Sequence, residues 1–181
     1  MANAPTMSHP LKEIFRSKKV ALGLLTRLAR SGDIARIAKT TGHDFIFIDG
    51  QHAGYNIETI GHMAQAALGI GIAPLVRVPS CDDPATQVLL DIGVTGIVFP
   101  DVNTAAEAKR AVDRCRFPPV GKRSVAGTYP IFDFRPIPAA DTVALQTENT
   151  LVVCMVETKE GIENVDAIAA VEGVDVVHVG A

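Results

Sequence analysis

The sequence predicts an α/β fold with a parallel β-sheet, specifically a (β/α)8 TIM barrel of which about six β/α units are present. Three observations predict it. Short, nearly continuous apolar runs recur six times along 181 residues, and helical patterns lie between most of them. No low-complexity segment or domain linker interrupts this alternation. We therefore expect residues 1–181 to form a single domain, an incomplete barrel.

Each expected strand is a run rich in aliphatic residues that ends at a turn former or a charged residue. A parallel sheet covered on both faces is built from such runs, because neither of its faces meets water. In chain order the runs are Val20–Leu24, Phe45–Ile48, Pro74–Pro79, Gly96–Pro100, Leu151–Glu157 and Val174–Val179.

The expected helices lie between these runs and show apolar residues at helical spacing. Asp33 is expected to cap the first of them, which continues to about Thr41. Residues 118–149 break the rhythm with five prolines and two glycines, so we expect a long ordered loop there. The remaining helices are expected at Ile57–Leu68, after Pro84 with Val88, Leu89 and Ile92 on the apolar face, at Thr104–Cys115 and at Gly161–Val171.

A parallel sheet of this kind can close as a barrel or stay open and doubly wound. The dinucleotide-binding form of the open sheet needs a glycine fingerprint between a strand and the next helix. Here Gly69 and Gly71 lie between a helix and a strand instead, so the barrel is favoured. Because barrels rarely have fewer than about 200 residues, we expect the natural polypeptide to be longer and this sequence to be C-terminally truncated after Ala181.

The amino-acid composition limits the kinds of binding partner that we expect for this protein. There are 17 basic and 20 acidic side chains, so no basic excess indicates a nucleic-acid or membrane partner. The three cysteines are scattered without CxxC spacing, which is typical of a reducing compartment. We found no apolar run of transmembrane length and no signal-peptide pattern near Met1. The expected location is the cytoplasm.

Residues that can carry chemistry stand at the ends of the expected strands, which meet at one mouth of a barrel. Asp49 can hold His52 in one tautomer and make it a better base. Arg77 can clamp a carboxylate with two parallel hydrogen bonds, and Glu157 can bind a hard divalent cation. Asp49 and Glu157 can equally be charges at the start of a helix, whereas Arg77 lies in an apolar run and needs a partner.

Two further polar residues near the mouth have structural interpretations. Asp101, which follows the fourth run, is expected to be a helix cap. His178 can face the interior of the barrel, but we expect it to be a core histidine whose hydrogen bonds are satisfied.

The segments that carry these residues together resemble the HpcH/HpaI aldolase family, whose barrel is of the phosphoenolpyruvate/pyruvate-binding type. The strand-to-loop motif is FIFIDGQH, and the arginine strand is PLVRVP. The resemblance covers about residues 18–181 with the elements in the same order, in segments 45–52, 74–79, 91–100, 117–124, 153–157 and 171–180.

The resemblance implies a divalent-metal-dependent class II aldolase, usually a hexamer. Glu157 would be one metal ligand, and an aspartate beyond Ala181 the other. His52 with Asp49 would act as acid and base through a bound water, and Arg77 would hold the pyruvyl group. The metal would be Mg2+, Mn2+ or Co2+. Two further residues, Gly180 and Ala181, would lie beside the substrate carboxylate.

Two positions depart from the family pattern. Gln51 stands where some members have glutamate, which makes the local charge less negative. Met155 stands where the best-known members have glutamine, which removes a possible polar contact with the substrate.

The expected reaction is cleavage of a 4-hydroxy-2-oxo acid to pyruvate and an aldehyde through a metal-stabilised pyruvate enolate. No lysine stands at a comparable strand end, so a Schiff-base route has little support. The alternatives are a related carbon–carbon lyase or decarboxylase acting on oxaloacetate or a citramalyl-CoA type of substrate, and a catalytically silent barrel that binds a keto acid. The expected partners are a small keto acid, an aldehyde and further copies of the chain.

Overall fold

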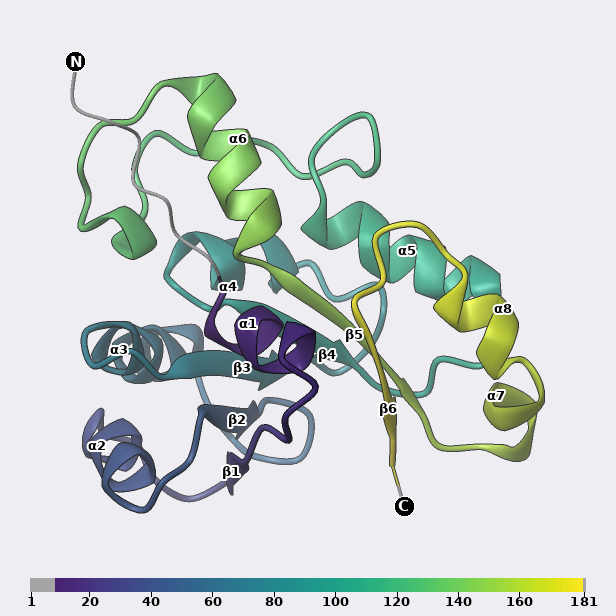
Figure 1. The fold of residues 1–181 in the computed structure, drawn as a ribbon, viewed down its shortest axis with the longest axis horizontal. Helices are drawn as coiled ribbons and strands as arrows, with labels where there is room; N and C mark the ends of the chain where they lie inside the picture. Colours follow the sequence, from purple (N-terminus) through teal and green to yellow (C-terminus); the bar gives the residue numbers. More distant parts are fainter. Residues whose placement is uncertain (1–8, 181) are drawn as a thin grey trace.

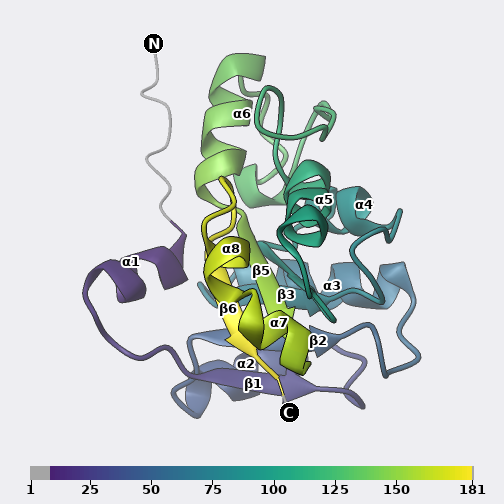
Figure 2. The ribbon, with the colours of Figure 1, turned by 90° about the vertical axis from the view of Figure 1, so that its right-hand side faces the viewer.

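A curled sheet of six parallel strands organises the molecule (Figures 1 and 2). The computed structural model describes residues 9–180. Each strand pairs with its neighbour in sequence order, without the reversal that an open doubly wound sheet requires. The strands are β1 (Gly23–Thr26), β2 (Phe45–Asp49), β3 (Ala73–Arg77), β4 (Gly96–Phe99), β5 (Leu151–Val156) and β6 (Val176–Val179).

Most helices lie between consecutive strands and pack on the outer face of the sheet. They include α2 (Asp33–Thr40), α3 (Ile57–Leu68), α4 (Thr86–Asp91), α5 (Ala105–Cys115), α7 (Lys159–Glu163) and α8 (Val165–Ala169). Two others depart from the repeat. The first, α1 (Pro10–Arg16), precedes the sheet, and α6 (Ala139–Glu148) follows a short 3-10 turn at Pro130–Phe132. No helix within residues 9–180 is long and apolar enough to span a membrane.

Alternate residues of each strand belong to two separate cores. Outward-facing side chains such as Ile97 and Val152 pack with the helices, whereas inward-facing ones such as Val98 and Val153 form an interior cluster that Leu11 of α1 joins. Within residues 9–180, a hollow of about 270 Å3 borders this cluster. The inward set continues with period two beyond Phe47, Leu75 and Met155, so it reaches the carboxyl ends of the strands at three polar residues, Asp49, Arg77 and Glu157.

The predicted strands are all present, and the first is shifted toward the C-terminus. We expected it at Val20–Leu24, but the ladder with β2 begins by pairing Gly23 with Phe45. Val20 is 84% exposed, because β2 offers no partner at that level. Prediction from apolar residues alone therefore placed this strand too far toward the N-terminus.

Three expectations about helices were wrong. Residues 118–149 contain α6, whose buried face carries the polar Thr142 and Gln146 and so shows no apolar stripe. The expected helix at Gly161–Val171 is two short helices, α7 and α8, which meet at Asn164. Gly32, not Asp33, is the N-cap of α2.

Candidate active site

The centre of the candidate site is an ion pair between the last residues of two adjacent strands. The β2–β3 ladder places Asp49 opposite Arg77. Arg77 donates from Nε to Oδ1 at 3.0 Å and from Nη2 to Oδ2 at 2.8 Å. Asp49 is fully buried, and the Arg77 side chain is 10% exposed. The partner that a guanidinium in an apolar run requires is therefore a carboxylate of the chain itself.

Further donors converge on the same carboxylate. Oδ2 of Asp49 accepts from Nε of Arg27 at 2.7 Å, and Oδ1 accepts from the main-chain N–H groups of Gln51 and His52, each at 3.2 Å. Burial alone would raise the pKa of Asp49, but the hydrogen bonds from Arg77 and Arg27 outweigh it and hold the pKa well below its ordinary value. Asp49 is consequently a permanent anion near neutral pH.

Sequence reasoning missed Arg27. It lies one residue beyond β1, and because the ladder pairs Thr26 with Ile48, Arg27 lies level with Asp49. The expected strand stopped at Leu24, so the residue was not recognised as a strand-end cation. A strand that continued to Thr26 would have placed Arg27 at the same mouth.

His52 stands in the turn after β2, at the expected end of the sheet, but its imidazole is not paired with Asp49. Five donors already occupy the two oxygens of Asp49, and the one from His52 is its main-chain N–H. The carboxylate therefore fixes the main chain of the turn and does not hold the imidazole. The side chain of His52 is exposed. Gly50 permits this tight turn, since a Cβ there would lie 2.7 Å from the carbonyl oxygen of Arg77.

Glu157 extends from the end of β5 into the space between two loops. Its Oε2 accepts from the main-chain N–H of Asp101 at 3.2 Å. Asp101 has φ of 53°, a left-handed conformation that turns this N–H toward Glu157. Asp101 is therefore not the cap that we expected. That role belongs to Thr104, which forms a capping box with Glu107 at the start of α5.

Met155 and Gly180 connect Arg77, at the end of β3, with Glu157, which follows β5. The sulfur of Met155 lies 3.9 Å from Nη1 of Arg77. A Cβ placed on Gly180 would lie 2.5 Å from Cε of Met155 and 2.8 Å from Oε1 of Glu157. Arg77, Met155, Gly180 and Glu157 thus lie close together at one mouth, where Arg77 and Glu157 were expected from their places at the ends of strands. Ala181, the other residue expected beside the substrate, lies outside the described residues.

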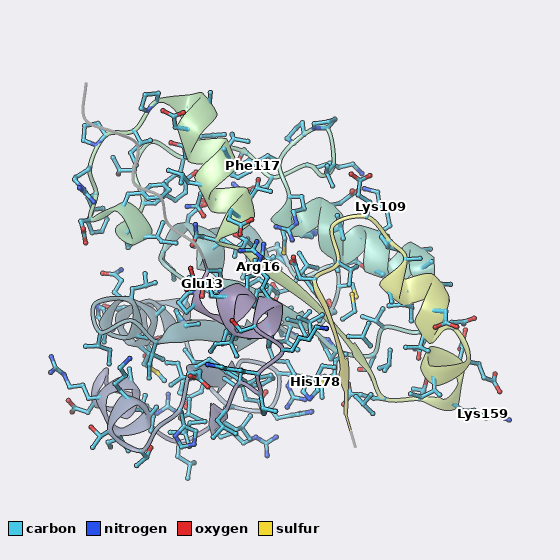
Figure 3. All side chains as sticks on the ribbon, in the orientation of Figure 1. Glu13, Arg16, Lys109, Phe117, Lys159 and His178 are labelled. Atoms are coloured by element: carbon cyan, nitrogen blue, oxygen red, sulfur yellow. The ribbon has the colours of Figure 1, made fainter. Side chains whose placement is uncertain are left out.

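His178 lies on the inner face of β6, two residues before Gly180, and is labelled in Figure 3. It is level with Met155 in the β5–β6 ladder and meets the ring of Phe47 edge-on, with centroids 6.1 Å apart. Burial lowers the pKa of His178; the negative charge of Glu157 opposes this, and the positive charge of Arg77 adds to it. The histidine therefore faces the barrel interior below the site.

The fit of a metal ion to these residues is partial. Glu157 offers a hard carboxylate at the mouth, which suits a divalent cation. Within residues 9–180, however, no three His, Cys, Asp or Glu side chains are grouped so that they could hold a metal ion. The described part of the chain thus contributes one candidate ligand.

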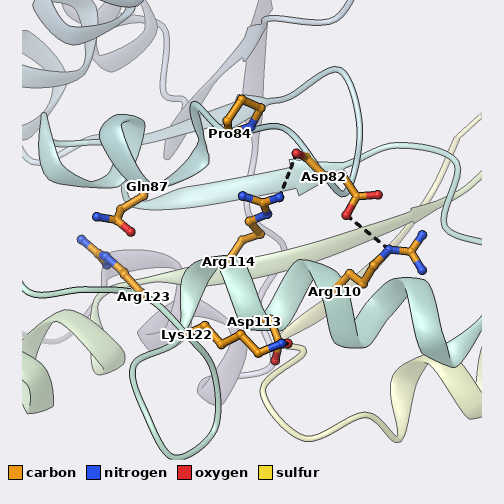
Figure 4. A pocket seen from close by; sticks show the side chains of 8 residues that line it. All are labelled: Asp82, Pro84, Gln87, Arg110, Asp113, Arg114, Lys122 and Arg123. Atoms are coloured by element: carbon orange, nitrogen blue, oxygen red, sulfur yellow. Dashed lines mark hydrogen bonds and ion pairs between the residues drawn. The ribbon is translucent and has the colours of Figure 1, made fainter.

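A polar hollow of about 300 Å3 is lined by residues of α4, α5 and the loops next to them (Figure 4). Three of its four cations are engaged by the chain's own oxygens, and the fourth, Arg123, donates from Nη2 to Asp91 at 2.8 Å while its Nε and Nη1 have no hydrogen-bond partner among residues 9–180. Arg110 pairs with Asp82 at 3.3 Å, and Arg114 donates to the carbonyl of Asp82 at 3.0 Å. Lys122 pairs with Asp113 at 2.6 Å. These pairs leave the strand-end cluster as the better candidate site.

A family model described as HpcH/HpaI aldolase/citrate lyase matches residues 26–181. The chain is 43% identical over 167 residues to a 4-hydroxy-4-methyl-2-oxoglutarate aldolase of Hapsidospora irregularis, covering 88% of this chain and 59% of that protein. It is 35% identical over 182 residues to a 5-keto-4-deoxy-D-glucarate aldolase of Shigella boydii serotype 18, covering 99% and 69%.

A solved structure shares this fold. The crystal structure of an HpcH/HpaI aldolase from Desulfitobacterium hafniense DCB-2 matches with a TM-score of 0.89 and 33% identity, covering 96% of this chain and 66% of that one. This match confirms the predicted fold class, with six parallel β/α units of a barrel in this chain. The chain spans 59% of the length of the Hapsidospora relative.

Proposed function

The chain belongs to the HpcH/HpaI aldolase/citrate lyase family, and from that premise we propose that it cleaves 4-hydroxy-2-oxo acids to pyruvate and an aldehyde or ketone. The observation that carries the proposal is the sharing of one strand-end mouth by Arg77, Met155, Gly180 and Glu157. Relatives named as aldolases of 2-oxo acids support the same chemistry.

Arg77 is proposed to hold the pyruvyl half of the substrate. Two of its donors are fixed on Asp49, so the guanidinium plane is oriented before a substrate arrives. Among residues 9–180, the one acceptor that its Nη1 meets is the sulfur of Met155, which is a weak acceptor. That edge can therefore donate to a keto acid and stabilise the negative charge that develops on its oxygens.

His52 is proposed to take the proton of the C4 hydroxyl, directly or through a water molecule. Its side chain is exposed in the turn after β2, and histidine is the side chain that acts most often as a general base in enzymes. As the proton leaves, the C4 oxygen forms a carbonyl, the C3–C4 bond breaks, and its electron pair passes into the enolate of pyruvate. Protonation of C3 then releases pyruvate. Asp49 supports this step by fixing the turn that carries His52.

Glu157 is proposed as one ligand of a divalent cation, Mg2+, Mn2+ or Co2+. When bound, the cation would act as a Lewis acid toward the 2-oxo acid. The chain's own contribution is to fix the carboxylate through the N–H of Asp101 and to leave space for it beside Gly180. By family resemblance we also propose a homo-oligomer, a hexamer, and from the sequence a cytoplasmic location.

Pyruvate release tests the proposal. The natural polypeptide, loaded with Mn2+, should release pyruvate from 4-hydroxy-2-oxo acids, and chelation should abolish the release. His52→Ala should lower kcat by about 10²–10⁴-fold while calorimetry still detects Mn2+ binding. Normal turnover of His52→Ala would exclude this histidine as the base.

Three other functions are distinguished by the same assay together with calorimetry. Exclusive turnover of oxaloacetate or citramalyl-CoA would identify a related lyase or decarboxylase. A catalytically silent keto-acid-binding barrel would bind pyruvate and release no product, whereas a barrel that serves only as a scaffold would show no metal-dependent pyruvate binding by calorimetry.

A further inference from the structure

Arg27 uses only part of its guanidinium on the chain itself. Its Nε donates to Asp49, whereas its other two nitrogens have no hydrogen-bond partner among residues 9–180. The Arg27 side chain is 48% exposed and the Asp49 side chain fully buried. The guanidinium is therefore anchored on its inner edge and open on its outer edge.

The local charge at this point is positive. Arg27 and Arg77 donate to the same oxygen, Oδ2 of Asp49, at 2.7 and 2.8 Å. Asp49 is a single negative charge, and Arg77 already neutralises it through two hydrogen bonds. The trio thus has a net charge of +1, and the uncompensated charge lies on the more exposed partner, Arg27. An anchored guanidinium with free N–H groups is suited to bind an anion.

We propose that Arg27 is a specificity-determining residue that binds a second anionic group on the substrate, on the half that leaves as the aldehyde or ketone. This inference rests on the proposed function. Arg77 holds the pyruvyl half, and Arg27 shares an Asp49 oxygen with Nη2 of Arg77, so the two guanidinium groups are neighbours. A carboxylate attached at C4 would then meet the open edge of Arg27, while Asp49 keeps both guanidinium groups in place.

Arg30 supplies a matched control from the same loop. It has the same charge, but Nη1 donates to the carbonyl of Gly54 at 3.0 Å and the guanidinium lies over the ring of Tyr55 at 5.3 Å. Its removal changes the charge near the mouth by the same amount without removing a guanidinium that is held on Asp49. Arg30→Gln therefore separates general electrostatic attraction from direct recognition by Arg27.

The test compares two substrates that differ in one charged group. We would measure kcat/KM of the metal-loaded natural polypeptide for 4-hydroxy-4-methyl-2-oxoglutarate and for 4-hydroxy-4-methyl-2-oxopentanoate, in which a methyl group replaces the second carboxylate. Dividing the two values and comparing the ratio between variants removes the intrinsic difference in substrate reactivity. Arg27→Gln should lower this ratio about 10–100-fold, the range for loss of a charge-assisted hydrogen bond. Arg30→Gln should change it less than about threefold.

Each other outcome has a definite meaning. If Arg27→Gln lowers kcat/KM equally for both substrates, Arg27 only positions Asp49 and the inference is wrong. An equal fall of the ratio in Arg30→Gln would also overturn it, in favour of general electrostatics. Arg27→Lys, which keeps the charge, should retain more of the ratio than Arg27→Gln, and thermal melting would show that both variants fold. Should no 4-hydroxy-2-oxo acid be cleaved at all, the proposed function fails first and the inference with it.

Discussion

Asp49 illustrates at the residue scale how one buried carboxylate can serve structure and chemistry together. It neutralises Arg77, anchors Arg27 and fixes the turn of His52. Sequence reasoning identified Asp49 by its place at the end of a strand, and Arg77 because a guanidinium in an apolar run needs a partner. It chose the wrong partner for Asp49, since the choice between the imidazole of His52 and two guanidinium groups depends on the register between strands.

Asp49→Asn should therefore destabilise the protein strongly. The amide keeps the shape but leaves the nearly buried Arg77 without a counter-ion, a change that costs about 3–5 kcal/mol in other buried pairs. Urea unfolding at pH 7 measures the free energy of unfolding. Asp33→Asn is the control, because its exposed carboxylate accepts from Ser31 and should cost less than about 1 kcal/mol. Equal losses in the two variants would show that the pair contributes little.

At the scale of elements, the strands were easier to predict than the helices. Strands that are buried on both faces, such as β3 and β5, show as uninterrupted apolar runs. α6 buries Thr142 and Gln146, and α1 has Leu11 as its only fully buried residue, so neither shows an apolar stripe. Helices stabilised by caps and polar contacts give a weaker signal in one sequence than strands stabilised by burial.

α1 depends on a titratable cap. The ring Nδ1 of His9 accepts from the N–H of Leu11, and the residue is fully buried. Burial, aided by the positive charge of Lys12, lowers the pKa of His9 from 6.5 to about 4. Between these two values the unfolded chain binds a proton that the folded chain does not. Stability is therefore fully present above pH 6.5 and falls as pH decreases toward 4.

His9→Asn tests this linkage, because asparagine also caps helices but does not titrate. The free energy of unfolding of the unaltered protein should fall by about 3 kcal/mol relative to the variant between pH 7.5 and pH 4. Urea unfolding at intervals of one pH unit would measure the difference. Parallel curves for the two proteins would mean that His9 does not destabilise the fold in acid.

At the scale of the whole molecule, the sheet separates two cores of different completeness. The outer core, between sheet and helices, has fully buried members on every strand from β2 to β5. The inner core is smaller and borders the hollow of about 270 Å3 below the candidate site. A close-packed region loses more dispersion contacts than a loosely packed one when a side chain is shortened. The two faces of one strand should therefore respond differently to the same substitution.

β5 offers this comparison in adjacent residues of one type. Val152 lies in the outer core and is fully buried, whereas Val153 lies in the inner core and borders the hollow. Val152→Ala should cost about 2–3 kcal/mol, the transfer of two methyl groups plus the cavity left behind. In the chain of residues 1–181, Val153→Ala should cost at least about 1 kcal/mol less, since the described residues leave part of its surroundings open. Urea unfolding of both variants measures the difference, and an equal or larger loss at Val153 would mean that the interior is as tightly packed as the outer layer.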